Sequence, residues 1–265
     1  MRKFLSLLLT MAMVLSLAVT VNAAAPKEDI TILHTNDVHC DYEKYAKVAT
    51  LHKSADLLVD AGDHVQGGVI GTLSKGEYIV DIMNYLKYDA AVPGNHEFDY
   101  GMDNMVRLFK MAKFPIVCAN YDFTGTELAN IVKPYVILHR KGLKIGVFGL
   151  APQLAGLVIE KNYGCIQYLD PIQKANEMTE ILKKKEKCDV IICISHLGWN
   201  IDGTDDTEVI AASRNIDLVL GGHSHSLFQT LKYRTDLDGK QVPVDQNGKG
   251  AIWVGKMTLD IVKNK

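Results

Sequence analysis

Short apolar runs alternate with longer stretches of helical pattern over most of the chain. The runs are rich in Ile, Val and Leu, which is typical of buried strands. They lie at residues 30–33, 57–59, 90–92, 116–118, 136–138, 145–148, 190–194 and 218–220. The stretches between them predict helices at about residues 77–86, 102–111, 171–185 and 206–213. This alternation indicates a layered α/β fold.

Two features indicate that the sheet is not purely parallel. Arg140, Lys141 and Gly142 separate two strand-like runs and predict a hairpin, and residues 251–262 predict one or two terminal strands. From the pattern alone we expect one mixed sheet system packed against helices. Such sheets place their ligands beyond the carboxyl ends of the strands.

The first 25 residues have the pattern of a signal peptide. Arg2 and Lys3 precede an apolar run at 4–21, and small residues follow at 23–25. We expect residues 1–25 to be removed and residues 26–265 to form a secreted catalytic domain, extracellular or in the periplasm or cell envelope. The alternative is an uncleaved membrane anchor, because the run approaches the length of about 20 residues that spans a bilayer. The alanines at 23–25 favour cleavage.

The composition is that of an ordinary globular protein. The 265 residues are 48% hydrophobic and 23% charged, which argues against disordered and fibrous classes. Without the leader, 27 basic residues face 31 acidic ones, a net charge of −4, so we expect no nucleic-acid binding. The five cysteines include no C-x-x-C pair, which argues against a zinc-thiolate site. Cys118 and Cys193 lie in apolar runs and are predicted to be buried.

Residue types that ligate metals follow five of the predicted strands directly. The clusters are His-Thr-Asn-Asp-Val-His at 34–39, Asp-Ala-Gly-Asp at 60–63, Pro-Gly-Asn-His-Glu at 93–97, Ser-His at 195–196 and Gly-Gly-His-Ser-His at 221–225. Asp37 and His39 are two residues apart in an extended turn, so they can share one cation. The carboxylate of Asp63 has two oxygens and can bridge two ions.

The remaining candidate ligands are one amide and three imidazoles: Asn95, His196, His223 and His225. This set of oxygen and nitrogen donors without sulfur suits manganese, zinc, iron, cobalt or nickel better than calcium or copper(I). Two ions roughly 3.5 to 4 Å apart can hold a phosphate and a hydroxide together and lower the pKa of the water.

His96 is the candidate acid that protonates the leaving alkoxide, and Asp99 is the candidate partner of its imidazole. Any single histidine can instead be a packed or surface residue. We assign such structural roles to His34, His52 and His139, and we leave His64 open.

Five motifs resemble those of the calcineurin-like metallophosphoesterases and, within them, the catalytic domain of the 5'-nucleotidase branch. They are Thr-Asn-Asp-Val-His at 35–39, Gly-Asp-His-Val-Gln-Gly at 62–67, Gly-Asn-His-Glu-Phe-Asp at 94–99, Ser-His-Leu-Gly at 195–198 and Gly-Gly-His-Ser-His at 221–225. The resemblance implies an α/β fold, a four-layer α-β-β-α sandwich with two mixed sheets.

The resemblance also implies the roles of the site residues. One ion lies among Asp37, His39, Asp63 and His225, and the other among Asp63, Asn95, His196 and His223. His96 and Asp99 assist the transition state and the leaving group.

The implied function is hydrolysis of phosphate monoesters, nucleoside 5'-monophosphates foremost, by attack of metal-activated hydroxide at two divalent ions. This branch usually continues into a carboxyl-terminal domain that grips the nucleoside. The sequence ends at Lys265, so we expect that domain to be absent and the nucleotide specificity to be weaker. Phosphodiesters and nucleotide sugars are alternative substrates. A secreted metal- or nucleotide-binding protein without turnover is another alternative, and the intact pair of His96 and Asp99 argues against it.

Overall fold

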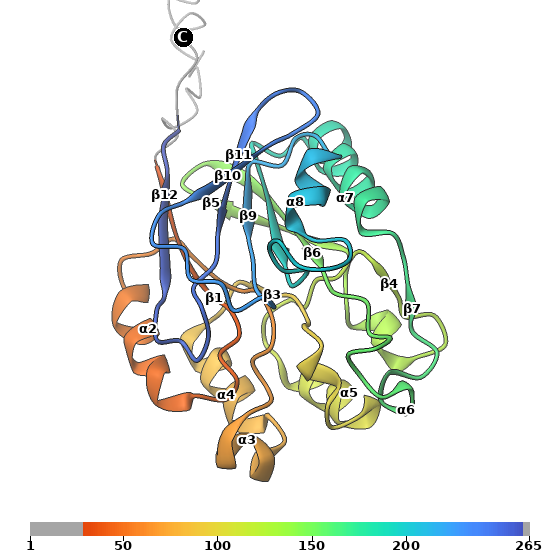
Figure 1. Ribbon diagram of the computed structural model, residues 1–265. Coiled ribbons are helices and arrows are strands. Elements are labelled where there is room, and N and C mark those ends of the chain that lie inside the picture. The colour runs from red at the N-terminus through yellow and green to blue at the C-terminus, as the bar shows by residue number, and fades with distance from the viewer. Residues whose placement is uncertain (1–28, 262–265) are drawn as a thin grey trace, which may run out of the picture.

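Two mixed β-sheets pack against each other in the computed structural model, which describes residues 29–261 (Figure 1). The four-stranded sheet has the order β12-β1-β2-β3, with β12 antiparallel to β1 and the other pairs parallel. Its strands are β1 (Ile30–Thr35), β2 (Leu57–Asp60), β3 (Ala90–Ala91) and β12 (Gly255–Leu259).

The six-stranded sheet has the order β10-β11-β9-β8-β6-β5, in which only the two outer pairs are antiparallel. Its strands are β5 (Tyr135–Arg140), β6 (Leu143–Leu150), β8 (Val190–Ser195), β9 (Leu218–Leu220), β10 (Lys232–Thr235) and β11 (Gln241–Asp245). A separate pair, β4 (Tyr121–Asp122) with β7 (Gln167–Tyr168), lies near the short helix α6 (Glu160–Tyr163).

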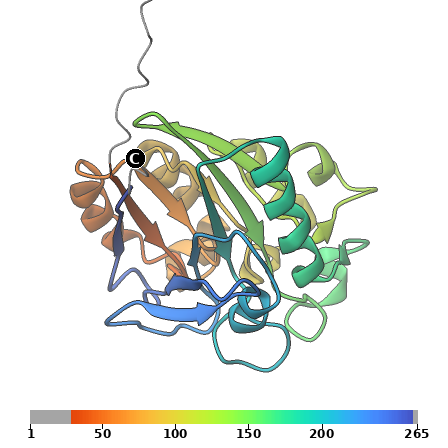
Figure 2. The same cartoon turned by 90° about the horizontal axis from the view of Figure 1, so that it is seen from above.

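Helices cover the outer side of each sheet, as the view from above shows (Figure 2). The helices beside the four-stranded sheet are α2 (Tyr45–His52), α3 (Gly68–Ser74), α4 (Glu77–Leu86) and α5 (Met102–Met111). The six-stranded sheet is covered by α7 (Pro171–Glu180), which continues as one π-helical stretch (Ile181–Lys185), and by α8 (Asp206–Ala211). Short 3-10 helices lie at Tyr42–Lys44, His96–Phe98 and Glu127–Asn130.

Alternate residues of the central strands face different layers. Ile192 and Ile194 of β8 belong to the core shared with the four-stranded sheet, whereas Ile191 and Cys193 belong to the core under α7 and α8. Because successive side chains of a strand point to opposite faces, this strand is buried on both sides. The four-layer arrangement expected from the family resemblance is therefore confirmed. The single sheet system expected from the pattern alone is wrong, since the strands divide between two sheets.

Local sequence signals explain several element boundaries. Asp170 caps α7, where its side chain accepts hydrogen bonds from the backbone N–H groups of Ile172 and Gln173. The predicted hairpin is confirmed, with β5 and β6 antiparallel and positive φ angles at Lys141 and Gly142 in the turn.

The helices α4 and α5 begin and end at the predicted residues, while α8 ends at Ala211, two residues before the prediction. Residues 116–118 do not form a strand but make isolated bridges to Ala91 and Lys133.

The predicted signal peptide lies outside the described residues. Among residues 29–261, every helix is too short or too polar to cross a bilayer.

Candidate metal centre

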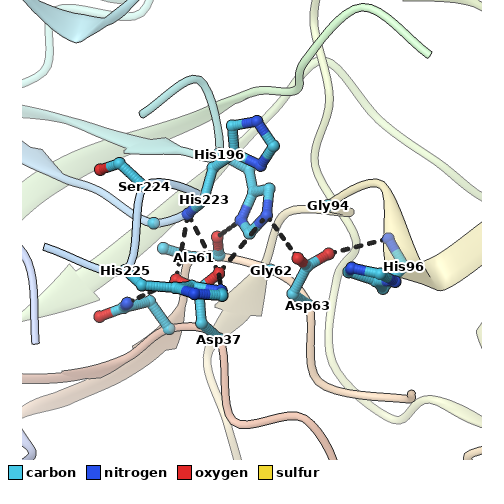
Figure 3. Close-up of polar contacts among 12 residues, drawn as sticks. Asp37, Ala61, Gly62, Asp63, Gly94, His96, His196, His223, Ser224 and His225 are labelled. Carbon is cyan, nitrogen blue, oxygen red and sulfur yellow. Dashed lines mark hydrogen bonds and ion pairs between the residues drawn. The ribbon is translucent and has the colours of Figure 1, made fainter. Parts of the chain in front are cut away.

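The seven candidate ligands follow the carboxyl ends of five strands, as the pattern predicted. Three of these strands belong to the four-stranded sheet, and two belong to the six-stranded sheet. The residues are Asp37 and His39 after β1, Asp63 after β2, Asn95 after β3, His196 after β8, and His223 and His225 after β9. Figure 3 shows most of these side chains pointing toward one another from the two sheets.

Asp37, His39 and His225 form the first group whose atoms can hold a metal ion. Their ligand atoms lie within 4.8 Å of one another. His225 Nε2 is 3.3 Å from Asp37 Oδ1 and 3.2 Å from His39 Nε2. A buried carboxylate and two imidazole nitrogens at this spacing are suitable ligands for a divalent cation.

Asp63, His196 and His223 form a second group, which is also within 4.8 Å. His196 Nε2 is 3.0 Å from Asp63 Oδ2 and 3.8 Å from Asp37 Oδ1, so this imidazole connects the two groups. The amide oxygen Oδ1 of Asn95 is buried without a hydrogen bond. Since buried polar atoms nearly always have a partner, this oxygen fits the role of a metal ligand.

The imidazole of His96 lies beside both groups. It joins His39 and Asp63 in a third group of possible ligands, and its ring centroid is 5.2 Å from that of His39. His96 Nδ1 is 2.7 Å from Asp99 Oδ2, and the His96 backbone N–H donates to Asp63 Oδ1 at 2.9 Å. The hydrogen bond with Asp99 raises the pKa of His96 above its ordinary value. The pair remains about one-third exposed and can reach a bound substrate.

The buried charged groups of the site strongly shift one another's pKa values. Burial lowers the pKa of His196, but the carboxylates of Asp63 and Asp37 raise it to about 10. Burial raises the pKa of Asp63, but His196 and His96 together hold it well below its usual range. Burial and the neighbouring His196 lower the pKa of His223 to about 4. Buried carboxylates that need positive charge nearby are a suitable setting for a cation.

The backbone is strained at most of the candidate ligands. Positive φ angles, uncommon for residues other than glycine, occur at Asp37 (50°), His39 (48°), Asp63 (58°), His223 (69°) and His225 (52°). Hydrogen bonds between loops hold this conformation, from Asp37 N to Gly62 O at 2.9 Å and from His39 N to Asp63 O at 3.0 Å. Such strain is typical of functional sites.

A glycine allows the loops to approach closely at one point. A Cβ atom at Gly94 would lie 2.2 Å from Asp63 Oδ1 and 2.6 Å from His196 Nε2. Gly94 therefore makes room for the central carboxylate.

Glu97 received no role from the sequence, and the structure places it directly behind the site. Its side chain is 1% exposed and accepts hydrogen bonds from the backbone N–H groups of Asp63, His64, Val65 and Gly94, at 2.9, 2.8, 3.2 and 2.5 Å. This single carboxylate thereby joins the loop of Asp63 to the loop of Asn95. An acidic residue three positions after a turn can reach back to a backbone N–H, as in a capping box, and that spacing was the available signal.

The histidines that were assigned structural roles lie outside the three groups. His34 is buried with Nε2 3.0 Å from Asp245 Oδ2, while His52 lies in α2 and His139 in β5. His64, which was left open, is also buried, with Nδ1 2.9 Å from Asp60 Oδ1. Burial lowers the pKa of His64, but Glu97 and Asp60 raise it to about 9, so the imidazole forms an ion pair behind the Asp63 loop. Cys118 and Cys193 are buried free thiols, as predicted.

Residues 30–227 match the sequence model of the calcineurin-like phosphoesterases. The chain belongs to this family. This is a family of phosphoester hydrolases, and the nitrogen and oxygen donors described above are compatible with divalent metal ions. The recognition of a calcineurin-like metallophosphoesterase from the five motifs is confirmed.

Among curated proteins, this calcineurin-like phosphoesterase is similar to the trifunctional nucleotide phosphoesterase protein YfkN of Bacillus subtilis. The two are 33% identical over 258 residues, which are 80% of this chain and 17% of YfkN. The chain is 30% identical to the 5'-nucleotidase of Homo sapiens over 288 residues, covering 94% of this chain and 49% of the human protein. It thus spans less than half the length of these two relatives.

Two solved structures have the same fold. The 5'-nucleotidase precursor from Thermus thermophilus matches with a TM-score of 0.80 at 24% identity, covering 88% of this chain and 52% of the other. The calcineurin-like phosphoesterase YfkN from Bacillus subtilis matches with a TM-score of 0.75 at 28% identity, covering 90% of this chain and 86% of the other.

Proposed function

We propose that this calcineurin-like phosphoesterase hydrolyses phosphate monoesters, nucleoside 5'-monophosphates foremost, at a centre of two divalent ions. The observation that carries the proposal is the presence of two neighbouring ligand groups, because Asp63 of the second group also lies within ligand distance of His39 of the first. The names of the relatives support a nucleotide substrate, since they include a nucleotide phosphoesterase and several 5'-nucleotidases.

Each ion has four candidate ligands, and Asp63 belongs to both sets. One ion would be held by Asp37, His39, Asp63 and His225, and the other by Asp63, Asn95, His196 and His223. When bound, the ions neutralise phosphate oxygens and acidify a water molecule. Manganese, zinc, iron, cobalt and nickel are all compatible with these nitrogen and oxygen donors.

The protein's own groups position the substrate and move the proton. His96 donates a proton to the leaving oxygen, while Asp99 holds Nδ1 of the imidazole at 2.7 Å and favours its protonated form. The hydrogen bond from His96 N to Asp63 Oδ1 fixes this acid relative to the ligand groups. The acid and the ligands therefore belong to one rigid arrangement.

The proposal includes export. Residues 1–25 have the sequence pattern of a signal peptide, and residues 26–265 form the catalytic domain. A relative with 30% identity is the snake venom 5'-nucleotidase of Crotalus adamanteus, which supports a protein that acts outside the cell. The substrate is a small phosphorylated molecule, and we expect no nucleic-acid binding and no membrane anchor after cleavage.

A metal-replacement assay tests the function. The purified protein is stripped with chelator, reloaded in turn with manganese, zinc, iron, cobalt or nickel, and assayed with p-nitrophenyl phosphate, AMP and bis-p-nitrophenyl phosphate. We expect both monoesters to be hydrolysed, and faster than the diester. Faster hydrolysis of the diester would assign the site to phosphodiesters instead. Absence of hydrolysis with every one of the five metals contradicts the proposal.

A further inference from the structure

The two candidate ligands that follow β9 project from a strained loop (Figure 3). His223 and His225 have φ angles of 69° and 52°, in the left-handed region that residues other than glycine rarely adopt. Such a conformation persists only where the surrounding structure holds it. The contacts that hold residues 221–226 therefore determine where these two imidazoles lie.

Gln246, the first residue after β11, holds this loop at three positions. Its side chain is fully buried, and its Nε2 donates to the backbone oxygen of Gly222 at 2.8 Å. Its Oε1 accepts from the backbone N–H of Ser226 at 2.6 Å and from the hydroxyl of Ser224 at 2.8 Å. Positions 222, 224 and 226 alternate with the ligand positions 223 and 225. One amide therefore contacts the loop on both sides of each candidate ligand.

The segment that carries Gln246 is also fixed to the loop after β1. Asn36 is buried, and its Oδ1 accepts from the backbone N–H of Asn247 at 2.9 Å. Its Nδ2 donates to the backbone oxygen of Gly248 at 2.8 Å and to Asp37 Oδ2 at 2.6 Å. Residues 246–248 thus bind the loops of both sheets, and the position of Gln246 is set relative to the Asp37 carboxylate.

The ends of the loop after β9 have backbone hydrogen bonds that do not involve the side chain of Gln246. Gly221 N donates to Asp245 O at 2.9 Å, and Gly248 N donates to Ser226 O at 2.8 Å. Loss of the Gln246 amide would therefore leave the loop attached at both ends. It would remove the acceptor of the Ser226 N–H group and one of two donors to the oxygen of Gly222. The strained middle of the loop is then free to relax, and the imidazoles move with it.

We propose that Gln246 is a positioning residue that sets His223 and His225 against the carboxylates of Asp37 and Asp63. The inference rests on the ligand assignment of the proposed function. His225 belongs to the first ligand group and His223 to the second. Gln246 therefore acts on both ion sites, although it belongs to neither group.

A comparison of two buried amides tests this role. Gln246→Met replaces the amide by an apolar side chain of similar length. Asn120→Leu is the matched control, because the amide of Asn120 is also fully buried, donates to Ala151 O at 2.7 Å and accepts from Ala151 N at 2.8 Å, and Ala151 is not a candidate ligand. Both variants should melt at a lower temperature, since both lose buried hydrogen bonds. Only Gln246→Met should bind manganese more weakly in calorimetric titration, by about tenfold or more.

Electron paramagnetic resonance gives a readout that lower stability alone would not change. Two manganese ions that share a ligand couple magnetically, so their spectrum differs from that of isolated ions. We expect the coupled spectrum in the manganese-loaded wild type and in Asn120→Leu, and its loss or weakening in Gln246→Met at the same loading. Gln246→Glu keeps an oxygen for the Ser226 N–H group but loses the donor to Gly222. It should show a smaller loss of affinity, and it provides the test if Gln246→Met does not fold.

The outcomes separate this inference from the proposed function. Hydrolysis of p-nitrophenyl phosphate by the wild type, together with unchanged manganese affinity in the Gln246 variants, overturns the positioning role alone. An equal loss of affinity in Asn120→Leu also overturns it, because affinity would then follow general stability. Weaker manganese binding in Gln246→Met, in a protein that hydrolyses none of the phosphate esters, supports the positioning role and contradicts the proposed function. A wild type that binds no manganese contradicts both.

Discussion

At the scale of single residues, Asp63 is the centre of the site. Its backbone has a φ of 58°, and its two oxygens face different partners, with Oδ1 toward His96 N and Oδ2 toward His196 Nε2. Asp63 also lies within ligand distance of His39, so we expect the loss of this side chain to affect both ligand groups and the proposed acid.

We predict that Asp63→Ala loses bound metal and activity together. Elemental analysis after dialysis against manganese should give far less metal than the wild type, and hydrolysis of p-nitrophenyl phosphate should fall to background. Asp81→Ala removes an exposed carboxylate and should change neither quantity. Full metal content in Asp63→Ala would show that this carboxylate does not bridge.

For His96 we expect activity to be lost without loss of metal, in contrast to Asp63. The reason is that His96 is proposed to donate a proton and not to ligate the ions. His96→Ala should retain its metal while turnover of AMP falls by about 10² to 10⁴, as for other general acids. Hydrolysis of p-nitrophenyl phosphate, whose leaving group needs no proton, should fall less. Unchanged turnover of AMP in His96→Ala would contradict the assignment of His96 as the general acid.

A third prediction concerns Asp206, which is fully enclosed beneath the site. Its Oδ1 accepts a hydrogen bond from Ser195 Oγ at 2.5 Å, and burial raises its pKa from 3.8 to about 7. Between these two values the folded chain binds more protons than the unfolded chain. The stability therefore falls as the pH rises from about 4 to about 7, by at most about 1.4 kcal/mol per pH unit.

Asp206→Asn should remove this contribution, because the amide imitates the protonated acid. Urea unfolding in the presence of chelator at several pH values measures it, with Asp81→Asn as the control. The difference in unfolding free energy between Asp206→Asn and the wild type should shift in favour of the variant from pH 4 to pH 7. A difference that is constant with pH would mean that Asp206 titrates normally.

The residues to which the proposed chemistry is assigned were predicted from the sequence, whereas the residues that support them were not. Asp37, Asn95 and His223 lie within four residues of the end of an apolar run, and the edge of a sheet brings such positions together. Glu97 and Asp206 lie among other polar residues, and their importance depends on burial, which comes from segments distant in the chain.

At the scale of elements, the site depends on how its loops are held to one another. Glu97 is a single carboxylate that binds four backbone N–H groups from two loops. The shared orientation of Asp63 and Asn95 therefore depends on a residue that contacts no substrate.

We predict that Glu97→Gln weakens metal binding and lowers the melting temperature. Glutamine replaces one accepting oxygen by an NH2 group that faces N–H donors, and an unsatisfied buried group costs about 1 to 3 kcal/mol. Calorimetric titration with manganese should show about a tenfold or greater loss of affinity. Glu77→Gln, which breaks an exposed ion pair with Arg107, should have little effect on either measurement. An unchanged affinity for manganese in Glu97→Gln would contradict the proposal that Glu97 orients the candidate ligands.

Elements with strong local patterns were predicted well, and those that depend on pairing were not. The helix α4 has four buried apolar residues at helical spacing, which are Ile79, Val80, Met83 and Leu86, and its predicted bounds are confirmed. Residues 116–118 are apolar and buried but make only isolated bridges. An apolar run predicts burial, but it does not show whether a neighbouring strand has enough length to pair.

At the scale of the whole molecule, the site lies where the two sheets meet. Asp37, Asp63 and Asn95 come from the four-stranded sheet, and His196 and His223 come from the six-stranded sheet. Each sheet supplies only part of the candidate ligands, so the packing of the two sheets against each other brings the proposed site together. The division into two sheets could not be predicted from local patterns, because strands of either sheet have similar apolar runs. It followed instead from the resemblance of the motifs to a known family.

The most direct test of this account is the anomalous diffraction of crystals of the chain loaded with manganese. We predict two anomalous peaks, both in contact with the carboxylate of Asp63. One should be surrounded by Asp37, His39 and His225, and the other by Asn95, His196 and His223. A single peak, or manganese bound by other residues, would contradict the proposed centre.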